Sequence, residues 1–157
     1  MSTEDIYNYL KINERLITSG QPTEEQLQAA AAEGFTAVIN LVPSENQSAL
    51  KNEGPIVQAL GLRHYHIPVD WAAPKDSDFA AFDAALQATS VEKVLIHCAA
   101  NFRVTAFYSL YALKHLGWTA EQAGAFRAVI WQDSDYPVWD EFIGRLTDQI
   151  QASGTTV

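Results

Sequence analysis

The single cysteine of the chain, Cys98, is followed after four residues by Arg103. Apolar β-forming residues precede the cysteine at 94–96, and after the arginine apolar residues recur at helical spacing as far as Gly117. The sequence therefore predicts that Cys98 lies where a buried strand gives way to the N-terminus of a helix.

A thiol and an arginine at a helix start are suited to binding and attacking an oxyanion. The first backbone N–H groups of a helix lack partners within it, and the helix dipole adds partial positive charge, so the position favours anions and a thiolate. The planar guanidinium of Arg103 adds donors that match a tetrahedral oxyanion. These groups predict that Cys98 attacks a phosphate monoester and forms a phosphocysteine. The alternative is that Cys98 is a small buried hydrophobic residue.

The segment His97-Cys98 to Arg103 resembles the active-site loop of the cysteine-dependent protein tyrosine phosphatases, especially their small dual-specificity branch. More narrowly, the chain from about 19–22 (Ser-Gly-Gln-Pro) onward is similar to bacterial phosphatase-like domains related to the beta-lactamase-hydrolase-like proteins. The loop departs from the phosphatase pattern, which has five residues between Cys and Arg and a glycine three after the Cys. Here four residues intervene, and Asn101 takes the place of the glycine.

The shortened segment is the predicted phosphate-binding loop. Asparagine is the non-glycine residue that best tolerates positive φ, so we expect Asn101 to preserve a tight turn. We expect the loop and its surroundings to contact the substrate phosphate through His97, Ala99, Ala100, Asn101, Phe102, Val104, Thr105 and Trp71.

Phosphoryl transfer to sulfur also needs a proton for the leaving alkoxide and later a base for water. The segment 67–74 resembles the phosphatase segment that carries the general-acid aspartate on a mobile loop. By position this residue is Asp70, with Asp76 and Asp78 as reserves. Asp70 could instead be a turn residue at a strand end, and the other two aspartates helix caps. The neighbouring Trp71 is expected to line a pocket together with Phe102.

Two further roles follow from the resemblance. The histidine before the cysteine, here His97, helps to order the loop and activate the thiol, or is a core histidine bonded to backbone. A Ser or Thr behind the arginine eases departure of the thiolate; Thr105 or Val104 occupies this place, and a Thr there can instead bond its own helix backbone. His64 and His66 share one face of a predicted strand, but no third ligand is spaced with them, so we expect no metal site.

Strands and helices alternate along the chain, which predicts an α/β fold. We expect a mostly parallel central sheet of four to five strands flanked by helices, with a helical C-terminal part. The resemblance implies the dual-specificity-phosphatase form of this fold and a single phosphatase-like domain over residues 1–157. Predicted strands cover 15–18, 36–42, 62–69 and 94–96, and predicted helical segments cover 6–10, 22–34, 50–60, 76–86, 104–116, 119–130 and 136–150. In such sheets ligands bind at the carboxyl ends of the strands, where Cys98 and Asp70 are placed.

Composition limits the possible partners. The 157 residues are 48% hydrophobic and carry a net charge of −9, which indicates a globular chain and argues against nucleic-acid or anionic-membrane partners. One cysteine excludes an internal disulfide, and no apolar run is long enough to span a bilayer. The N-terminus is acidic and polar, so we expect a cytoplasmic protein with a reduced thiol. The expected partners are a phosphorylated small molecule or phosphoprotein, with inorganic phosphate or sulfate in the loop, and no cofactor is required.

Two other functions fit the same residues. Rhodanese-like sulfurtransferases also place a cysteine loop between strand and helix, often with four residues between Cys and Arg, and would carry a persulfide on Cys98. A catalytically inactive relative would bind phosphate or a phosphoprotein through the loop without turnover. The His97-Cys98 pair and the segment 68–70 favour the phosphatase.

Overall fold

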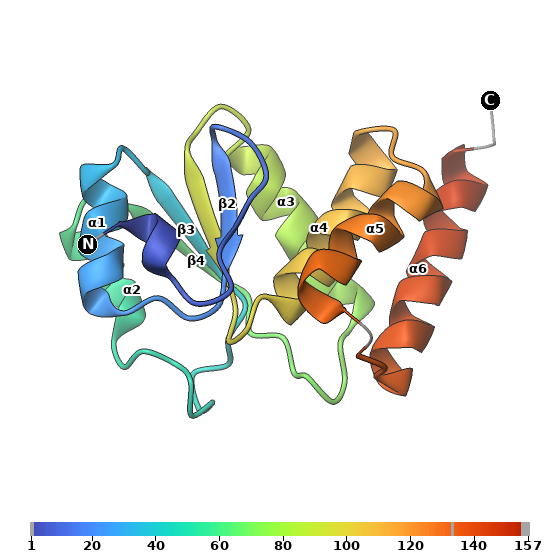
Figure 1. Ribbon diagram of the computed structural model, residues 1–157, viewed down its shortest axis with the longest axis horizontal. Helices are drawn as coiled ribbons and strands as arrows, with labels where there is room; N and C mark the ends of the chain where they lie inside the picture. The colour runs from blue at the N-terminus through green and yellow to red at the C-terminus, as the bar shows by residue number, and fades with distance from the viewer. Residues whose placement is uncertain (1, 133, 155–157) are drawn as a thin grey trace.

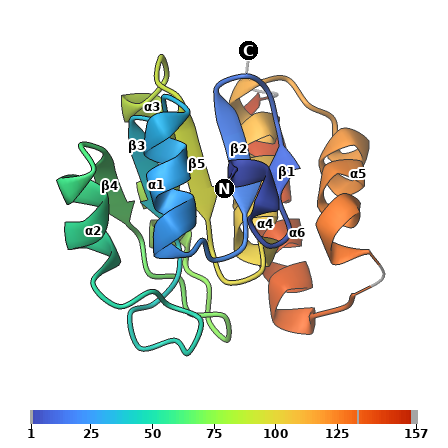
Figure 2. The ribbon, with the colours of Figure 1, turned by 60° about the vertical axis from the view of Figure 1, so that its left-hand side comes forward.

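A computed structural model describes residues 2–132 and 134–154 of the chain. Its sheet has five strands in the order β1-β2-β5-β3-β4 (Figures 1 and 2). The strands are β1 (Leu10–Lys11), β2 (Leu16–Ser19), β3 (Ala37–Asn40), β4 (Arg63–His66) and β5 (Val94–His97). β1 pairs antiparallel with β2 and all other neighbours pair in parallel, so the prediction of a mostly parallel α/β sheet is confirmed.

Helices cover both faces of this sheet. They are η1 (Thr3–Asp5), α1 (Glu24–Ala32), α2 (Glu53–Ala59), α3 (Asp76–Ala88), α4 (Phe102–His115), α5 (Ala120–Trp131) and α6 (Pro137–Gly154). Helices α1 and α2 lie on one face and α3 and α4 on the other, while α5 and α6 pack outside α4 (Figures 1 and 2). Within the described ranges, no helix is both long enough and apolar enough to cross a membrane.

The buried strands supply two hydrophobic cores because successive side chains point to opposite faces. On β5, Leu95 packs with residues of α1 and α2, such as Leu27 and Val57. Its neighbours Val94 and Ile96 pack in the larger core on the other face. All four residues of β5 are buried, which confirms the prediction of a strand covered on both faces. The site at the end of β5 is therefore held by a rigid element.

Helix boundaries follow the capping signals in the sequence. Thr23 accepts a hydrogen bond from the Gln26 backbone while the Gln26 side chain accepts one from the Thr23 backbone, and Thr119 and Gln122 repeat this arrangement before α5. Gly34 follows α1 with φ +94°, a conformation that glycine adopts without strain.

Two local predictions need correction, and one strand was missed. The helical turn expected at 6–10 is wrong, because the turn is η1, where Glu4 donates to the Ser2 hydroxyl and the Ser2 N–H to Asp5. The edge strand β1, only two residues long, was not predicted, since so short a segment has no period. Phe102, expected in a loop, is the first residue of α4.

Candidate active site

Cys98 lies at the edge of the sheet where the parallel strands end. It directly follows β5, and its backbone N–H donates to the carbonyl of Ser19 at the end of β2 (3.2 Å). Three residues later Asn101 precedes α4 with φ 69° and ψ 4°, the left-handed conformation expected at this position. The strand, loop and helix predicted around the cysteine are thus present in the structure.

The amide of Asn101 attaches the loop to the N-terminal segment. Its Nδ2 donates to the carbonyl of Asn8 (2.8 Å) and to the hydroxyl of Thr18 (3.0 Å). In return, Nδ2 of Asn8 donates to the carbonyl of Ala100 (2.9 Å). A glycine at position 101 could adopt the same φ but could make none of these side-chain bonds. Asparagine therefore provides both the turn and its anchor.

The segment after β2 packs directly on the same loop. The backbone N–H of Gln21 donates to the carbonyl of Ala99 (3.1 Å). A Cβ atom on Gly20 would lie only 2.7 Å from that carbonyl oxygen and 2.7 Å from Cδ2 of Tyr7. Glycine is required here because the two chain segments approach so closely.

The loop and the start of α4 present several donors that could bind an anion. Among the described residues, no acceptor is bonded to the backbone N–H groups of Ala99, Ala100, Phe102, Arg103 and Val104. The side chain of Arg103 is only 5% exposed, and its Nε has no hydrogen-bond partner within the described ranges. Its Cζ lies 5.5 Å from the centre of the Trp71 ring. No described carboxylate pairs with this buried cation, so an anion at the loop would supply its counter-charge.

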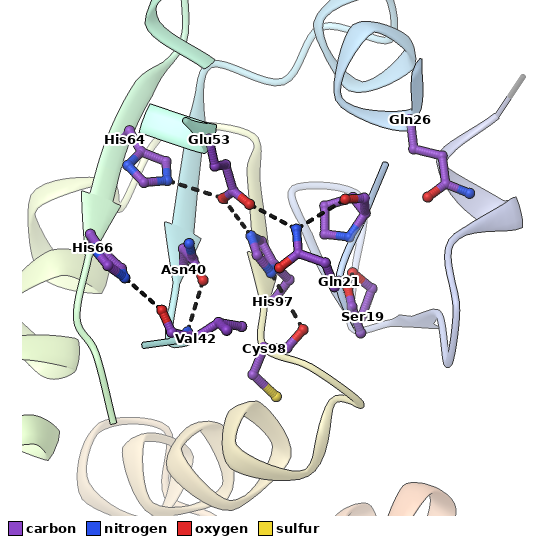
Figure 3. A network of polar contacts seen from close by, with 12 residues as sticks. Ser19, Gln21, Gln26, Asn40, Val42, Glu53, His64, His66, His97 and Cys98 are labelled. Carbon is purple, nitrogen blue, oxygen red and sulfur yellow. Dashed lines mark hydrogen bonds and ion pairs between the residues drawn. The ribbon is translucent and has the colours of Figure 1, made fainter. Parts of the chain in front are cut away.

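The thiol and the preceding histidine are both enclosed. Cys98 is 1% exposed and His97 is fully buried. Figure 3 shows the sulfur of Cys98 directed away from the imidazole of His97. The imidazole Nδ1 lies 3.4 Å from the backbone carbonyl oxygen of Cys98, a long contact.

Asp70 lies in the connection between β4 and α3, beside the same edge of the sheet. Its carboxylate is exposed and accepts a hydrogen bond from the N–H of Ala72 (2.9 Å), as in a turn that starts with aspartate. Of the two reserve aspartates, Asp78 accepts from the N–H of Lys75 (3.0 Å) at the start of α3. Asp76 is ion-paired with Arg145.

Aromatic side chains anchor the connection that carries Asp70. The carbonyl of Trp71 accepts a hydrogen bond from Nε1 of Trp139 (2.8 Å). The Trp71 ring lies 5.0–6.2 Å, between ring centres, from those of Phe102, Trp131, Tyr136 and Trp139. Trp71 and Phe102 are therefore neighbours at the start of α4, while Trp131 and Trp139 are buried in the core.

Thr105 and Val104 follow the arginine in the first turn of α4. The hydroxyl of Thr105 is within donating distance of the carbonyls of Asn101 (2.9 Å) and Phe102 (3.1 Å), and it accepts from Nε1 of Trp131 (3.0 Å). Thr105 thus bonds its own helix backbone, which is the alternative to a role in easing departure of the thiolate. Val104 is fully buried in the core.

The sequence reasoning missed Glu53, the first residue of α2. Figure 3 shows its carboxylate between two imidazoles: Oε2 lies 2.7 Å from Nε2 of His97 and 3.0 Å from Nε2 of His64. Oε1 accepts from Nε2 of Gln21 (2.8 Å). Burial opposes ionisation, but His97 and these hydrogen bonds outweigh it and hold the pKa of Glu53 well below its usual range.

His66 has a different partner, because its Nε2 lies 2.6 Å from the carbonyl oxygen of Val42. Beside this histidine and Glu53 lies a cavity of about 440 Å³ between α2, β4 and the segment after β3. In the described part of the chain, no cluster of three or more His, Cys, Asp or Glu side chains is arranged to hold a metal ion.

Comparison with known proteins identifies the family. Residues 8–114 match the family described as "Beta-lactamase hydrolase-like protein, phosphatase-like domain". The chain belongs to this family. A Beta-lactamase hydrolase-like protein of Xylella fastidiosa (strain Temecula1) is 34% identical over 102 residues, which are 63% of this chain and 23% of that protein. The chain thus spans only about a quarter of the length of its curated relatives.

Solved structures agree with this assignment. A crystal structure from Shewanella putrefaciens CN-32, described as "Putative phosphatase (DUF442)", is 32% identical, has a TM-score of 0.85, and is matched over 94% of this chain and 95% of that chain. P. aeruginosa TpbA, solved in complex with pTyr, is 15% identical with a TM-score of 0.76, over 100% of this chain and 94% of its own. The second likeness concerns the fold alone. The resemblance to the bacterial phosphatase-like domains is thus confirmed by the family match, and the fold inferred from sequence is confirmed by its likeness to solved phosphatase structures.

Proposed function

We propose that this protein hydrolyses phosphate monoesters through a phosphocysteine on Cys98. One observation carries the proposal: a buried arginine without a described anionic partner lies at a helix start whose first N–H groups have no acceptor among the described residues, five residues after the only cysteine. Such a site stabilises the charge of a phosphate and of the transition state in its transfer. Family membership supports the same reaction.

The first step transfers the phosphoryl group to the enzyme. The loop N–H groups and Arg103 hold the phosphate oxygens while the thiolate of Cys98 forms a bond to phosphorus. The bond between phosphorus and the alcohol oxygen breaks, and Asp70 gives that oxygen a proton. Asp70 is assigned because it directly precedes Trp71, whose ring lies over Arg103, whereas Asp78 caps a helix.

The second step releases the phosphate. Water attacks phosphorus and gives a proton to the carboxylate of Asp70, while the bond between sulfur and phosphorus breaks. Inorganic phosphate leaves, and the thiolate of Cys98 is restored. Every group in this cycle belongs to the chain, the substrate or water. A phosphorylated small molecule or a phosphoprotein is the proposed partner, and pTyr peptides are a first choice because a relative in fold binds pTyr.

The test is hydrolysis of p-nitrophenyl phosphate and of a pTyr peptide by wild type, Cys98→Ser and Arg103→Lys. We expect Cys98→Ser to abolish turnover and Arg103→Lys to lower kcat/KM at least 100-fold, because lysine cannot bind a phosphate with a planar pair of donors. Arg145→Lys, at a surface arginine bound to Asp76, is the matched control and should keep full activity. Acid quenching with ³²P-labelled substrate should trap a phosphoprotein in wild type only.

Other outcomes would replace the proposal. Thiosulfate-to-cyanide turnover without phosphate release would identify a sulfurtransferase that uses a persulfide on Cys98. Protection against heat by phosphate, with neither reaction, would identify a phosphate-binding module. Absence of hydrolysis for every aryl phosphate, with no change in Cys98→Ser, would exclude a phosphatase.

A further inference from the structure

Glu53 joins separate elements at the edge of the sheet where Cys98 lies. Its carboxylate is bonded to His97 at the end of β5, to His64 in β4, and to Gln21 in the segment after β2 (Figure 3). The residue itself comes from α2 and is only 4% exposed. A single side chain thus connects α2 with three parts of the edge that carries the cysteine loop.

The charge of Glu53 fits this position. The carboxylate begins a helix, where the dipole favours negative charge, and it faces two imidazoles and an amide. These partners keep the pKa of Glu53 low in spite of burial, so the carboxylate is ionised at neutral pH. An ionised acceptor makes shorter and stronger hydrogen bonds than a neutral one.

The imidazole of His97 is consequently held through its Nε2 atom. Its Nε2, 2.7 Å from the carboxylate, carries a proton that it donates to Glu53. Its Nδ1 faces the backbone carbonyl of Cys98, and the ring is fully buried, so it has little freedom to turn. The position of the ring in turn limits the backbone of Cys98, whose sulfur points away from it (Figure 3).

We propose that Glu53 is a positioning residue for the phosphatase reaction: its carboxylate holds His97, and through His97 the backbone from which the Cys98 thiolate attacks. The inference rests on the proposed function. It assigns Glu53 no contact with the substrate. Because the effect passes through His97, removing the carboxylate should slow the chemical step and leave substrate binding by Arg103 and the loop intact.

The central test compares Glu53→Gln, which keeps the size of the side chain but removes its charge, with Glu33→Gln. Glu33 is a matched control, because its carboxylate also accepts two hydrogen bonds, from the N–H (2.9 Å) and hydroxyl (2.6 Å) of Thr3. It lies near Lys93, at the opposite end of β5 from Cys98. With p-nitrophenyl phosphate, we expect Glu53→Gln to lower kcat about 10- to 100-fold with KM within about twofold, and Glu33→Gln to change neither.

A second readout needs no turnover. The rate of Cys98 alkylation by iodoacetamide, measured from pH 5 to 9 with and without phosphate, should follow a different pH profile in Glu53→Gln, where His97 is no longer held, and the wild-type profile in Glu33→Gln. If the profile and kcat of folded Glu53→Gln both match wild type, the positioning role is wrong. If the wild type hydrolyses no phosphate ester but the alkylation profile of Glu53→Gln still differs from that of wild type, the phosphatase proposal is refuted and the link from Glu53 to the thiol stands.

A double-mutant cycle tests the route through His97. In a His97→Asn background, Glu53→Gln should cause less than a twofold further loss, and a fully multiplicative loss would refute the route. If Glu53→Gln does not fold, an NMR measurement on the wild type tests the proposal instead. The Nε2 proton of His97 should give a downfield, slowly exchanging signal that His97→Asn removes, and a missing signal would overturn the hydrogen bond on which the proposal depends.

Discussion

Asn101 illustrates how much one residue decides in this loop. Its left-handed backbone was predictable, because asparagine is the residue that most readily replaces glycine at positive φ. Its second role is to donate hydrogen bonds to Asn8 and Thr18, which lie about ninety residues earlier in the chain. No local sequence pattern predicts such a contact.

The two roles of Asn101 can be separated by substitution. Asn101→Gly keeps the backbone conformation and loses only the side-chain bonds, whereas Asn101→Ala also places a Cβ at positive φ. We expect both variants to be less stable than wild type, with Asn101→Ala lower than Asn101→Gly by about 1 kcal/mol. Urea denaturation measures the difference. Equal stabilities would mean that the backbone at this position carries no strain.

The proposed acid can be tested by the leaving group. Asp70→Asn should lower kcat on an alkyl phosphate about 100-fold, because an alkoxide needs a proton, and change p-nitrophenyl phosphate hydrolysis far less. Asp78→Asn is the matched control: its amide oxygen can still accept from the N–H of Lys75 at the start of α3, so stability and the rates on both esters should stay close to wild type. Steady-state kinetics of both variants on both esters measures this selectivity. If Asp78→Asn rather than Asp70→Asn shows the selective defect on the alkyl phosphate, Asp78 is the general acid.

At the scale of elements, the contact between the segment after β2 and the cysteine loop is closer than any side chain allows. Gly20→Ala would bring a Cβ to 2.7 Å from the carbonyl of Ala99. Because backbone lies on one side and Tyr7 on the other, we expect a loss of about 1–3 kcal/mol in the free energy of unfolding. We also expect kcat/KM to fall, since relief of the clash must displace the loop. Gly124→Ala, on α5, should have neither effect.

The order of helices and strands was largely readable from the sequence, and the reasons are local. Capping pairs such as Thr23 with Gln26, and the apolar run of β5, act within a few residues of themselves. The edge strand β1 was missed because two residues cannot show alternation, and the turn at η1 because its cap is formed by only four residues. Element boundaries that depend on partners elsewhere in the fold are not encoded nearby.

At the scale of the whole molecule, the network around Glu53 is the part of the site that could not be predicted from the sequence. An acid at the start of a helix is expected on dipole grounds alone, and two histidines on one face of a strand indicate a metal pair as readily as an ion pair. Only the parallel arrangement of β5, β3 and β4 brings His97 and His64 to the same carboxylate. The cysteine loop could be predicted because its residues are contiguous in the sequence. The residues of the network beside it come from three distant segments and could not.

This network predicts a characteristic loss of stability in acid. The pKa of Glu53 is lowered in the folded chain from an ordinary value of 4.5, so the unfolded chain binds the proton more tightly. The stabilisation is therefore complete above about pH 4.5 and is lost progressively as the pH falls below it towards the folded value. Glu53→Gln lacks this contribution at every pH, and we expect it to be less stable than wild type by on the order of 3 kcal/mol at pH 7.

The comparison of the two proteins across pH cancels the contributions of titrating groups that do not contact Glu53, including Asp140, whose pKa is raised by its hydrogen bond to Asp135. Urea denaturation of wild type and Glu53→Gln at pH 7, 5, 4 and 3 should show a gap that is constant down to pH 5 and then narrows, because wild type alone loses the charge of Glu53. The gap should change little in high salt, since the carboxylate is buried. A gap that stays the same at pH 3 would mean that Glu53 contributes through packing rather than through its charge.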